Sequence, residues 1–434
     1  MFKKWLSMLT AVSVLFVCLS GAVCAEEAAS GDKSDVALTD LIDGWPQMGP
    51  ISEGTGLLID ADSGGVLFSL NRDAIRYPAS TTKVLTALLV LENTSLKDVV
   101  TMTETGTQMA VSGSSNAGTV VGEQFTVEQC LYMLLLKSAN DIANQLAEQV
   151  SGSLEKFAEL MNRRAEELGC RNSHFTNPSG MPDSEHYTTA EDMALIMREA
   201  IKNETFLKIA QTETATIPPT NKTAEKRTYT NHNALLIKGS EYYYEPCIAG
   251  KTGYTDAAWR TYLAAAEKNG RTLVLVLMKG PDKSDFVDAA KLFEYGFNEF
   301  EKLEVPGGFV TLPAGKTLED TTDETEDAGD GRLTVRFYYN QLPVGSAEMT
   351  EAQYKELRHF SSSGNDEKKD ANGAARGVRT LIFALLIAAA FILIGVAVRV
   401  MRDEKRIERR ERRREEKAAR SREEKVVRSR RERE

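Results

Sequence analysis

The chain has 434 residues, of which 42% are hydrophobic and 27% charged, and its formal net charge is −10. This composition is ordinary for a globular protein with a sizeable core, and it excludes a fibrous or an intrinsically disordered chain. The length allows two or three domains, but composition alone indicates no function.

An apolar run close to the N-terminus predicts a secretory signal peptide. Two lysines at positions 3 and 4 precede a mostly apolar run over residues 9–17, and small residues end the segment at Ala25. This order of basic, apolar and small residues is typical of an export signal that is cleaved. An uncleaved anchor is the alternative, although the run is short for the ~20 residues that a membrane span needs. We predict a signal peptide over residues 1–25.

A longer apolar segment near the C-terminus predicts a transmembrane helix. Residues 381–398 carry no charge, and at about 1.5 Å per helical residue they cross most of a ~30 Å hydrocarbon layer. Lys and Arg crowd the chain from Arg399 onward, and the positive-inside rule places this tail in the cytoplasm. We therefore expect a single-pass protein of the cell membrane, with its large middle part outside.

Acidic residues alternate with the basic ones in the tail, for example Glu411, Glu415 and Glu416. This pattern favours a solvated helix or a disordered tail over a site for anionic lipids or nucleic acid. Because the whole chain is acidic while the tail is net basic, the exported part is more acidic than the total. We expect no nucleic acid partner.

Cysteine and histidine usage indicates neither a disulfide framework nor a metal site. Outside the signal segment only Cys130, Cys170 and Cys247 remain, so one disulfide at most can form and burial in the core is favoured. The four histidines share no ligand spacing, and no HExxH motif or pair of CxxC motifs occurs. We expect no cofactor and no metal.

The middle of the chain alternates strand and helix patterns. Residues 56–60 and 66–70 flank a turn and read as a β-hairpin. Helical spacing of apolar residues predicts helices over 80–93, 127–150, 154–168 and 192–201. Two neighbouring strands, 261–266 and 272–278, precede a final helix over 284–300. The fold class is therefore α/β of the α+β kind, with an antiparallel sheet covered by helices.

The composition changes after Pro306. Short strand-like segments at 308–313, 333–339 and 344–349 surround an acidic stretch and predict a small β module, followed by a polar stalk. The predicted organisation is a signal peptide (1–25), a flexible lead-in (26–45), a catalytic domain (46–302), the β module (303–352), the stalk (353–379), the transmembrane helix (380–398) and the charged tail (399–434).

A Ser-x-x-Lys sequence offers a nucleophile and a base. Ser80 stands at the predicted start of a helix, and Lys83 lies three residues later on the same face. A serine hydroxyl needs a base, and no partner histidine is evident, so a lysine of lowered pKa is the natural candidate. The motif alone is weak evidence, because roughly one or two Ser-x-x-Lys matches are expected by chance in a chain of this length with average composition. Ser30-Gly-Asp-Lys33 and Ser153-Leu-Glu-Lys156 also match.

Two further elements follow in order. Lys137-Ser-Ala-Asn-Asp141 comes after an apolar run, and a polar helix junction would also explain it. Lys251-Thr-Gly253 precedes a strand-like segment, and such a triplet is expected only ~0.1 times by chance in a chain of this size. An ordinary strand entered through a glycine turn does not explain all three elements in this order.

With these elements the chain resembles the low-molecular-weight penicillin-binding proteins, which are D-alanyl-D-alanine carboxypeptidases of the serine peptidase family that shares the β-lactamase fold. The resemblance spans about residues 55–300. The matching blocks are 77–86, 137–141, 175–181, 186–192 and 251–255. It implies an antiparallel sheet flanked by helices, with the site in the groove between the sheet and the helical lobe.

The resemblance implies catalytic roles for three residues. Ser80 would attack the D-Ala–D-Ala carbonyl and form an acyl-enzyme, Lys83 would take its proton, and Ser138 would relay a proton toward the leaving D-alanine. Water would then release the acyl group. Penicillins and other β-lactams should be trapped at the same serine, and the natural partner should be the peptidoglycan stem peptide that ends in D-Ala-D-Ala.

The resemblance also implies substrate-binding roles for five residues. Asn140 would hold the peptide amide, while Lys251 and Thr252 would bind the terminal carboxylate. Gly253 would let the substrate backbone lie close to the strand, and the N–H of Tyr254 would complete an oxyanion hole with that of Ser80.

The chain departs from the family pattern at two places. It has Ser179-Gly180-Met181 where many members have His-Gly-Leu, and His232 where some members have an arginine. A helper role for His232 is one interpretation, and a surface-loop histidine is the favoured one.

Two other functions remain open from the sequence. A serine β-lactamase uses the same Ser, Lys and Lys-Thr-Gly set but needs a further carboxylate to activate water, and no Glu-x-x-Leu-Asn segment lies between Asn140 and Lys251. A non-catalytic peptidoglycan-binding scaffold is the second. Such a scaffold has no chemical reason to keep Ser80, Lys83 and Ser138 together.

Overall fold

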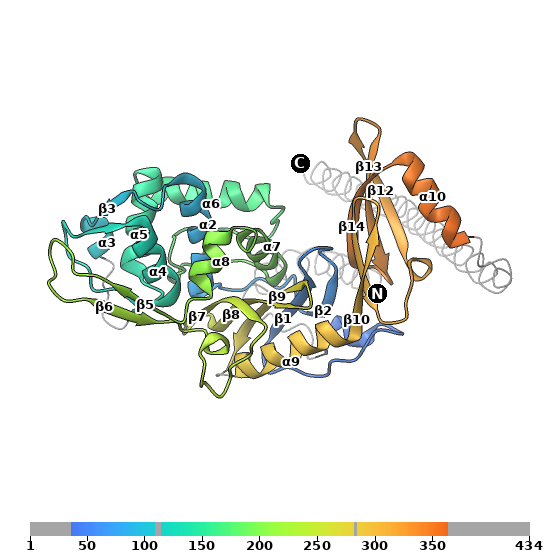
Figure 1. Cartoon of the computed structure of the whole chain (residues 1–434), viewed down its shortest axis with the longest axis horizontal. Helices are drawn as coiled ribbons and strands as arrows, with labels where there is room; N and C mark the ends of the chain where they lie inside the picture. The colour runs from blue at the N-terminus through green and yellow to red at the C-terminus, as the bar shows by residue number, and fades with distance from the viewer. Residues whose placement is uncertain (1–35, 109–113, 282–283, 363–434) are drawn as a thin grey trace, which may run out of the picture. The chain divides into compact units, whose positions relative to one another are not determined.

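The computed structural model of the chain describes residues 36–108, 114–281 and 284–362 (Figure 1). The predicted signal peptide, transmembrane helix and charged tail lie outside these ranges. Within them, no helix combines the length and the apolar character that crossing a membrane requires.

The central element is a five-stranded antiparallel sheet in the order β2-β1-β9-β8-β7. It joins the hairpin β1 (Thr55–Asp60) and β2 (Val66–Leu70) to the later strands β7 (Cys247–Thr255), β8 (Trp259–Lys268) and β9 (Arg271–Gly280). Leu57 pairs with Val276 in the β1–β9 ladder, so the early hairpin and the three later strands form one sheet. Strand β7 forms one edge of this sheet.

Helices cover both faces of the sheet. Helices α7 (Ala190–Ala200) and α9 (Ser284–Glu299) both contact strands β8 and β9 (Figure 1). All six residues of β1 and all five of β2 are buried, so side chains pointing to either face lie in the core. The predicted hairpin, strand pair and closing helix are confirmed.

The remaining helices form a lobe that flanks β7. They are α2 (Lys83–Asn93), α3 (Glu104–Thr107), α4 (Val127–Leu136), α5 (Asn140–Ser151), α6 (Leu154–Glu167) and α8 (Glu204–Ala210). Two short ladders belong to the same lobe: β3 (Val99–Thr101) with β4 (Gln124–Thr126), and β5 (Thr214–Ile217) with β6 (Arg227–Thr230). The α+β class is confirmed.

The expected single helix over 127–150 is wrong, because the structure divides it into α4 and α5. The break falls at Lys137-Ser138-Ala139, where Ser138 takes a left-handed backbone conformation with φ of 60°. A non-glycine residue adopts this region at a cost, and no helix continues through it. Apolar periodicity on both sides of the break hides it from sequence analysis.

The lead-in predicted for residues 26–45 is partly structured. A short 3-10 helix, η1 (Leu38–Leu41), is followed by Trp45, whose side chain is buried and donates from Nε1 to the carbonyl oxygen of Leu67 at 2.9 Å. This burial ties the segment to β2. Residues 36–45 therefore pack against the sheet rather than extend freely.

A second five-stranded antiparallel sheet follows α9, in the order β10-β11-β14-β13-β12. Its strands are β10 (Phe300–Val305), β11 (Gly308–Pro313), β12 (Thr322–Gly329), β13 (Arg332–Tyr339) and β14 (Leu342–Thr350), and α10 (Glu351–Ser362) comes next. The acidic stretch that we expected to lie between the strands contains a strand itself, β12, at one edge of this sheet. Charged side chains on an edge strand oppose pairing with another chain.

The three cysteines of the described ranges are free thiols. Burial raises the pKa of Cys247 to about 11 and that of Cys170 to about 12, and it also raises the pKa of Cys130. The predicted burial of thiols in the core is confirmed for Cys130 and Cys247, and such groups are poor nucleophiles at neutral pH.

Candidate active site

The candidate nucleophile stands where a tight turn enters helix α2. Ser80 belongs to the 3-10 helix η2 (Ala79–Thr82), which Lys83 continues as α2. Ala79 has a φ of 49°, a costly conformation for a residue with a side chain. Its carbonyl oxygen lies so close to Gly180 that any Cβ at Gly180 would collide with it. The loop that contains Gly180, called the 180 loop below, therefore packs closely against the turn that positions Ser80.

Lys83 lies directly below Ser80. Its side chain is fully buried, and Nζ is 3.0 Å from Ser80 Oγ. Nζ also donates to Asn140 Oδ1 at 2.7 Å and to the carbonyl oxygen of Ser179 at 2.6 Å. Burial lowers the pKa of Lys83 well below its ordinary value, and the charge of Lys251 lowers it further. A neutral amine is thus favoured beside the serine hydroxyl.

The break between α4 and α5 brings Ser138 and Asn140 to the same pocket. Ser138 is 5% exposed, and its Oγ has no hydrogen-bond partner among the described residues. An unsatisfied buried hydroxyl is unusual in a protein interior, and functional sites are one place where it occurs. Two hydrogen bonds to Ser115 hold the loop between α4 and α5 in place: Asn140 N donates to Ser115 O at 2.8 Å, and Ser115 Oγ donates to Lys137 O at 2.6 Å.

Strand β7 forms the opposite wall of the pocket. Thr252, Gly253 and Tyr254 line it, and Tyr254 is 63% exposed. A Cβ on Gly253 would lie 2.8 Å from the backbone N of Ser80, so only glycine lets the strand approach the nucleophile this closely. Lys251 is buried, and burial lowers its pKa to about 7. Its charge acts on Lys83.

The pocket has a volume of about 470 Å³ and contains residues that the motif analysis did not select. Arg260 of β8 lines it, with Nε and Nη2 donating to the buried carboxylate of Asp285 at 3.0 and 2.7 Å. Its guanidinium also lies over the ring of Phe286, 5.7 Å from the centroid. No local motif marks Arg260, because its partners lie on α9 and only the fold brings them together.

Other pocket residues come from loops. Met181 contacts Asn140 Nδ2 through its sulfur at 3.6 Å, and Ser114 lines the wall beside Ser138. His232 lines the pocket as well, with an exposed side chain. Within the described ranges, no group of three or more His, Cys, Asp or Glu side chains is arranged to hold a metal ion.

An α+β domain with a serine and a buried lysine 3.0 Å apart, between a helical lobe and an edge strand, has the arrangement that a serine enzyme with a lysine base requires. The family described as D-alanyl-D-alanine carboxypeptidase matches residues 46–282. The chain belongs to this family.

Individual relatives agree with this assignment. The chain is 30% identical over 306 residues to the D-alanyl-D-alanine carboxypeptidase DacF of Bacillus subtilis, covering 66% of this chain and 76% of DacF. It is 36% identical over 257 residues to DacB2 of Mycobacterium tuberculosis, covering 57% and 84%.

Solved structures agree as well. A D-alanyl-D-alanine carboxypeptidase from Mycobacterium tuberculosis H37Rv matches with a TM-score of 0.54 and 33% identity, over 59% of this chain and 95% of that one. The Streptomyces K15 DD-transpeptidase matches with a TM-score of 0.54 and 29% identity, over 58% and 99%.

The two lysines predict a bell-shaped dependence of peptidase kcat/KM on pH. The rate should rise as Lys83 loses its proton, and it should fall above about pH 7 as Lys251 loses the charge that would bind a carboxylate. Lys251→Arg keeps a positive charge at all accessible pH values, so the alkaline fall should disappear in this variant. Initial rates between pH 5 and 10 check this. An alkaline fall at the same pH in both proteins would contradict the assignment.

Proposed function

We propose that the chain is a serine-type D-Ala-D-Ala carboxypeptidase that removes the terminal D-alanine from peptidoglycan stem pentapeptides. The observation that carries the proposal is the 3.0 Å contact between Ser80 Oγ and Lys83 Nζ at the base of an open pocket. Family membership supports the reaction, since the relatives carry this activity in their names.

Acylation begins at Ser80. As Oγ forms a bond to the carbonyl carbon between the two D-alanines, its proton passes to Lys83 Nζ, and the carbonyl electron pair moves onto oxygen. The backbone N–H groups of Ser80 and Tyr254 would donate to this oxyanion. The close packing of Gly253 against Ser80 N supports this role, because it sets the strand and the turn side by side.

The tetrahedral intermediate then expels D-alanine. Its C–N bond breaks, and the amine nitrogen takes a proton from Lys83, for which Ser138 Oγ is the proposed relay. Because this hydroxyl has no hydrogen-bond partner among the described residues, it can donate to and accept from the reacting groups. Water attacks the remaining ester, and the proton that it loses returns to Ser80 through Lys83.

Charged and polar groups on β7 and β8 would hold the substrate. Thr252 lines the pocket, whereas the neighbouring Lys251 is buried and donates from Nζ to the carbonyl oxygen of Thr252 at 2.7 Å. Both are proposed to bind the terminal carboxylate, and Arg260 adds a cation in the pocket lining. Asp285 holds the Arg260 guanidinium in place. The Oδ1 atom of Asn140 already accepts from Lys83, which leaves Nδ2 to donate to a carbonyl of the substrate.

The same chemistry predicts capture of β-lactams as a lasting acyl-enzyme. A β-lactamase needs a carboxylate that activates the deacylating water. The residues that line the pocket within the described ranges include no Asp or Glu. This observation favours the carboxypeptidase over the β-lactamase.

Ser80→Ala should lower D-alanine release from a D-Ala-D-Ala pentapeptide by a factor on the order of 10⁴ or more, because no other group can form the acyl-enzyme. The matched control is Ser153→Ala, at the other described Ser-x-x-Lys sequence. Ser153 caps α6 by accepting from Lys156 N, so its loss costs about 1 kcal/mol of stability. The control should keep its activity, and equal activity of Ser80→Ala and wild type would refute Ser80 as the nucleophile.

We further propose that residues 1–25 direct export, that residues 380–398 anchor the protein in the cell membrane, and that residues 399–434 lie in the cytoplasm. The apolar character of residues 381–398 and the basic residues after them support this topology.

A truncation after residue 379 tests the anchor. After cell fractionation, the full chain should sediment with membranes and resist an alkaline wash, whereas the truncated chain should be recovered in the soluble extracytoplasmic fraction. Membrane retention of the truncated chain would place the anchor elsewhere, for example in an uncleaved N-terminal segment.

A further inference from the structure

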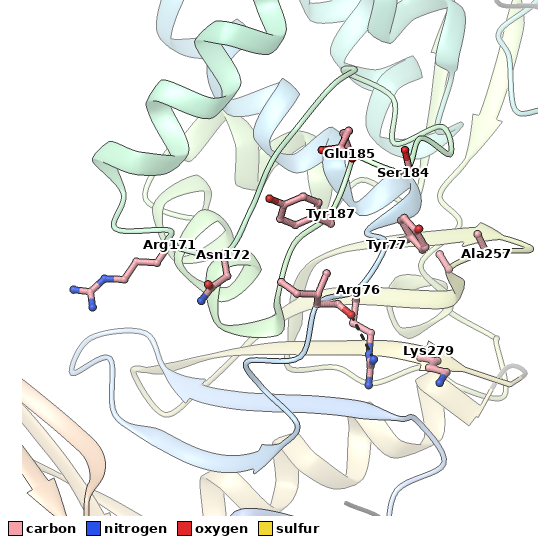
Figure 2. Close-up of a pocket in the computed structure, with 11 residues that line it drawn as sticks. Arg76, Tyr77, Arg171, Asn172, Ser184, Glu185, Tyr187, Ala257 and Lys279 are labelled. Carbon is pink, nitrogen blue, oxygen red and sulfur yellow. Dashed lines mark hydrogen bonds between the residues drawn. The ribbon is translucent and has the colours of Figure 1, made fainter. Parts of the chain in front are cut away.

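A second cavity of about 650 Å³ lies outside the catalytic pocket and shares no lining residue with it. Figure 2 shows its walls. Arg76 and Tyr77 come from the segment before the nucleophile, Glu185 and Tyr187 from the loop before α7, and Lys279 from the end of β9. The cavity is larger than the catalytic pocket, and the proposed chemistry does not use it.

Three chain segments contribute to both cavities. Residues 75–77 line the second cavity and Ser80 lines the catalytic pocket. Similarly, Gly180 and Met181 line the catalytic pocket, whereas Ser184, Glu185 and Tyr187 line the second cavity. The turn between β7 and β8 gives Ala257 and Ala258 to the second cavity, whereas residues on both sides of it face the catalytic pocket. The two cavities therefore adjoin each other along these segments.

The proposed substrate orientation leads from one cavity to the other. If the terminal carboxylate lies at Lys251 and Thr252 and the scissile carbonyl at Tyr254, the rest of the stem peptide continues along β7 toward Ala257. Strand β7 is a sheet edge, which suits pairing with an extended peptide. Three or four residues of extended chain cover ~10–13 Å. Ala257 and Ala258, three and four positions after Tyr254, line the second cavity, so the residues just before D-Ala-D-Ala would extend toward it.

The charges that line this cavity are mainly positive. Arg76 is 8% exposed, and its guanidinium is fixed by Nε donating to Thr55 Oγ1 at 2.9 Å. Lys279 Nζ lies over the ring of Trp259, 5.8 Å from the centroid. Arg171 adds a third cation, and Glu185 is the one acid in the lining.

The rings of Tyr77 and Tyr187 supply apolar surface between these charges. Asp256, in the adjoining turn, accepts from the hydroxyl of Tyr254 at 3.1 Å and does not line the cavity. Three cations and one acid favour an anionic ligand, although the exported part of the chain as a whole is acidic.

We propose that this cavity, the upstream subsite, binds a free carboxylate on the stem-peptide residues that precede D-Ala-D-Ala. The proposal rests on the proposed function, because it uses the direction of the bound peptide along β7. Lys279, at the end of the cavity near Ala257, contacts the carboxylate, while the fixed Arg76 and, from the opposite end of the cavity, the exposed Arg171 add positive potential (Figure 2). The subsite therefore selects acidic stem peptides over amidated ones.

Two synthetic pentapeptides test the subsite. Both end in D-Ala-D-Ala, and they differ only at the second residue, which carries either a free carboxylate or its amide. Wild type should prefer the acid in kcat/KM by roughly fivefold, as expected for a partly exposed ion pair. In the double variant Arg171→Gln, Lys279→Gln the ratio should fall to about one. A double variant that keeps the wild-type ratio, or a wild type without preference, would overturn the proposal.

The matched control removes two other surface cations, with Lys202→Gln and Lys208→Gln. Both side chains are 66% exposed, form surface ion pairs and line neither cavity. This control should keep the activity and the preference, and a loss of preference here would show a general charge effect instead of a subsite.

Binding to Ser80→Ala separates the subsite from the reaction. Calorimetry should show tighter binding of the acidic peptide to this variant, and equal affinities would overturn the subsite. Absence of D-alanine release from both peptides by wild type would instead refute the proposed function, and the calorimetric comparison would still decide the subsite.

Discussion

The contact between Ser80 and Lys83 depends on how the lysine nitrogen is surrounded. A neutral amine has two N–H groups and one lone pair. Two carbonyl oxygens, Asn140 Oδ1 and Ser179 O, accept hydrogen bonds from Nζ, and neither can donate one. The lone pair of the neutral amine is then left for the hydroxyl of Ser80, 3.0 Å away. Full burial lowers the pKa of Lys83 and so favours the neutral amine. In the proposed mechanism this one buried side chain both orients the serine and accepts its proton.

Much of the surrounding structure serves to hold this contact in place. Ala79 and Ser138 both have positive φ angles, at a cost on the order of 1–3 kcal/mol each, and both adjoin reacting groups. The 180 loop and strand β7 close on Ser80 from two sides through Gly180 and Gly253, where a Cβ would collide. The five-stranded sheet, buried on both faces, supplies the rigidity that such strain requires.

Sequence patterns predicted four strands of the central sheet, most helices and the motifs because these depend on local spacing. Ser80 and Lys83 are one helical turn apart, and β8 and β9 are joined by a short turn. Strand β7 was not predicted, since Lys251-Thr-Gly253 was expected to precede a strand and instead lies within one. The break at Ser138 was predicted only in part: Lys137-Ser-Ala-Asn-Asp141 was interpreted as a possible polar helix junction, but apolar spacing on both sides of it predicted a single helix over 127–150. Arg260 and the upstream subsite escaped prediction, because their residues meet only when β8, α9 and the loop before α7 pack together.

The central claim is that Ser80 forms an ester whose formation depends on Lys83. Mass spectrometry of the protein after incubation with benzylpenicillin tests it most directly. The account predicts one added penicilloyl group, located by peptide mapping on Ser80, and a strongly slowed addition in Lys83→Gln. An adduct on another residue, or an equal rate of addition in Lys83→Gln and wild type, would contradict the account.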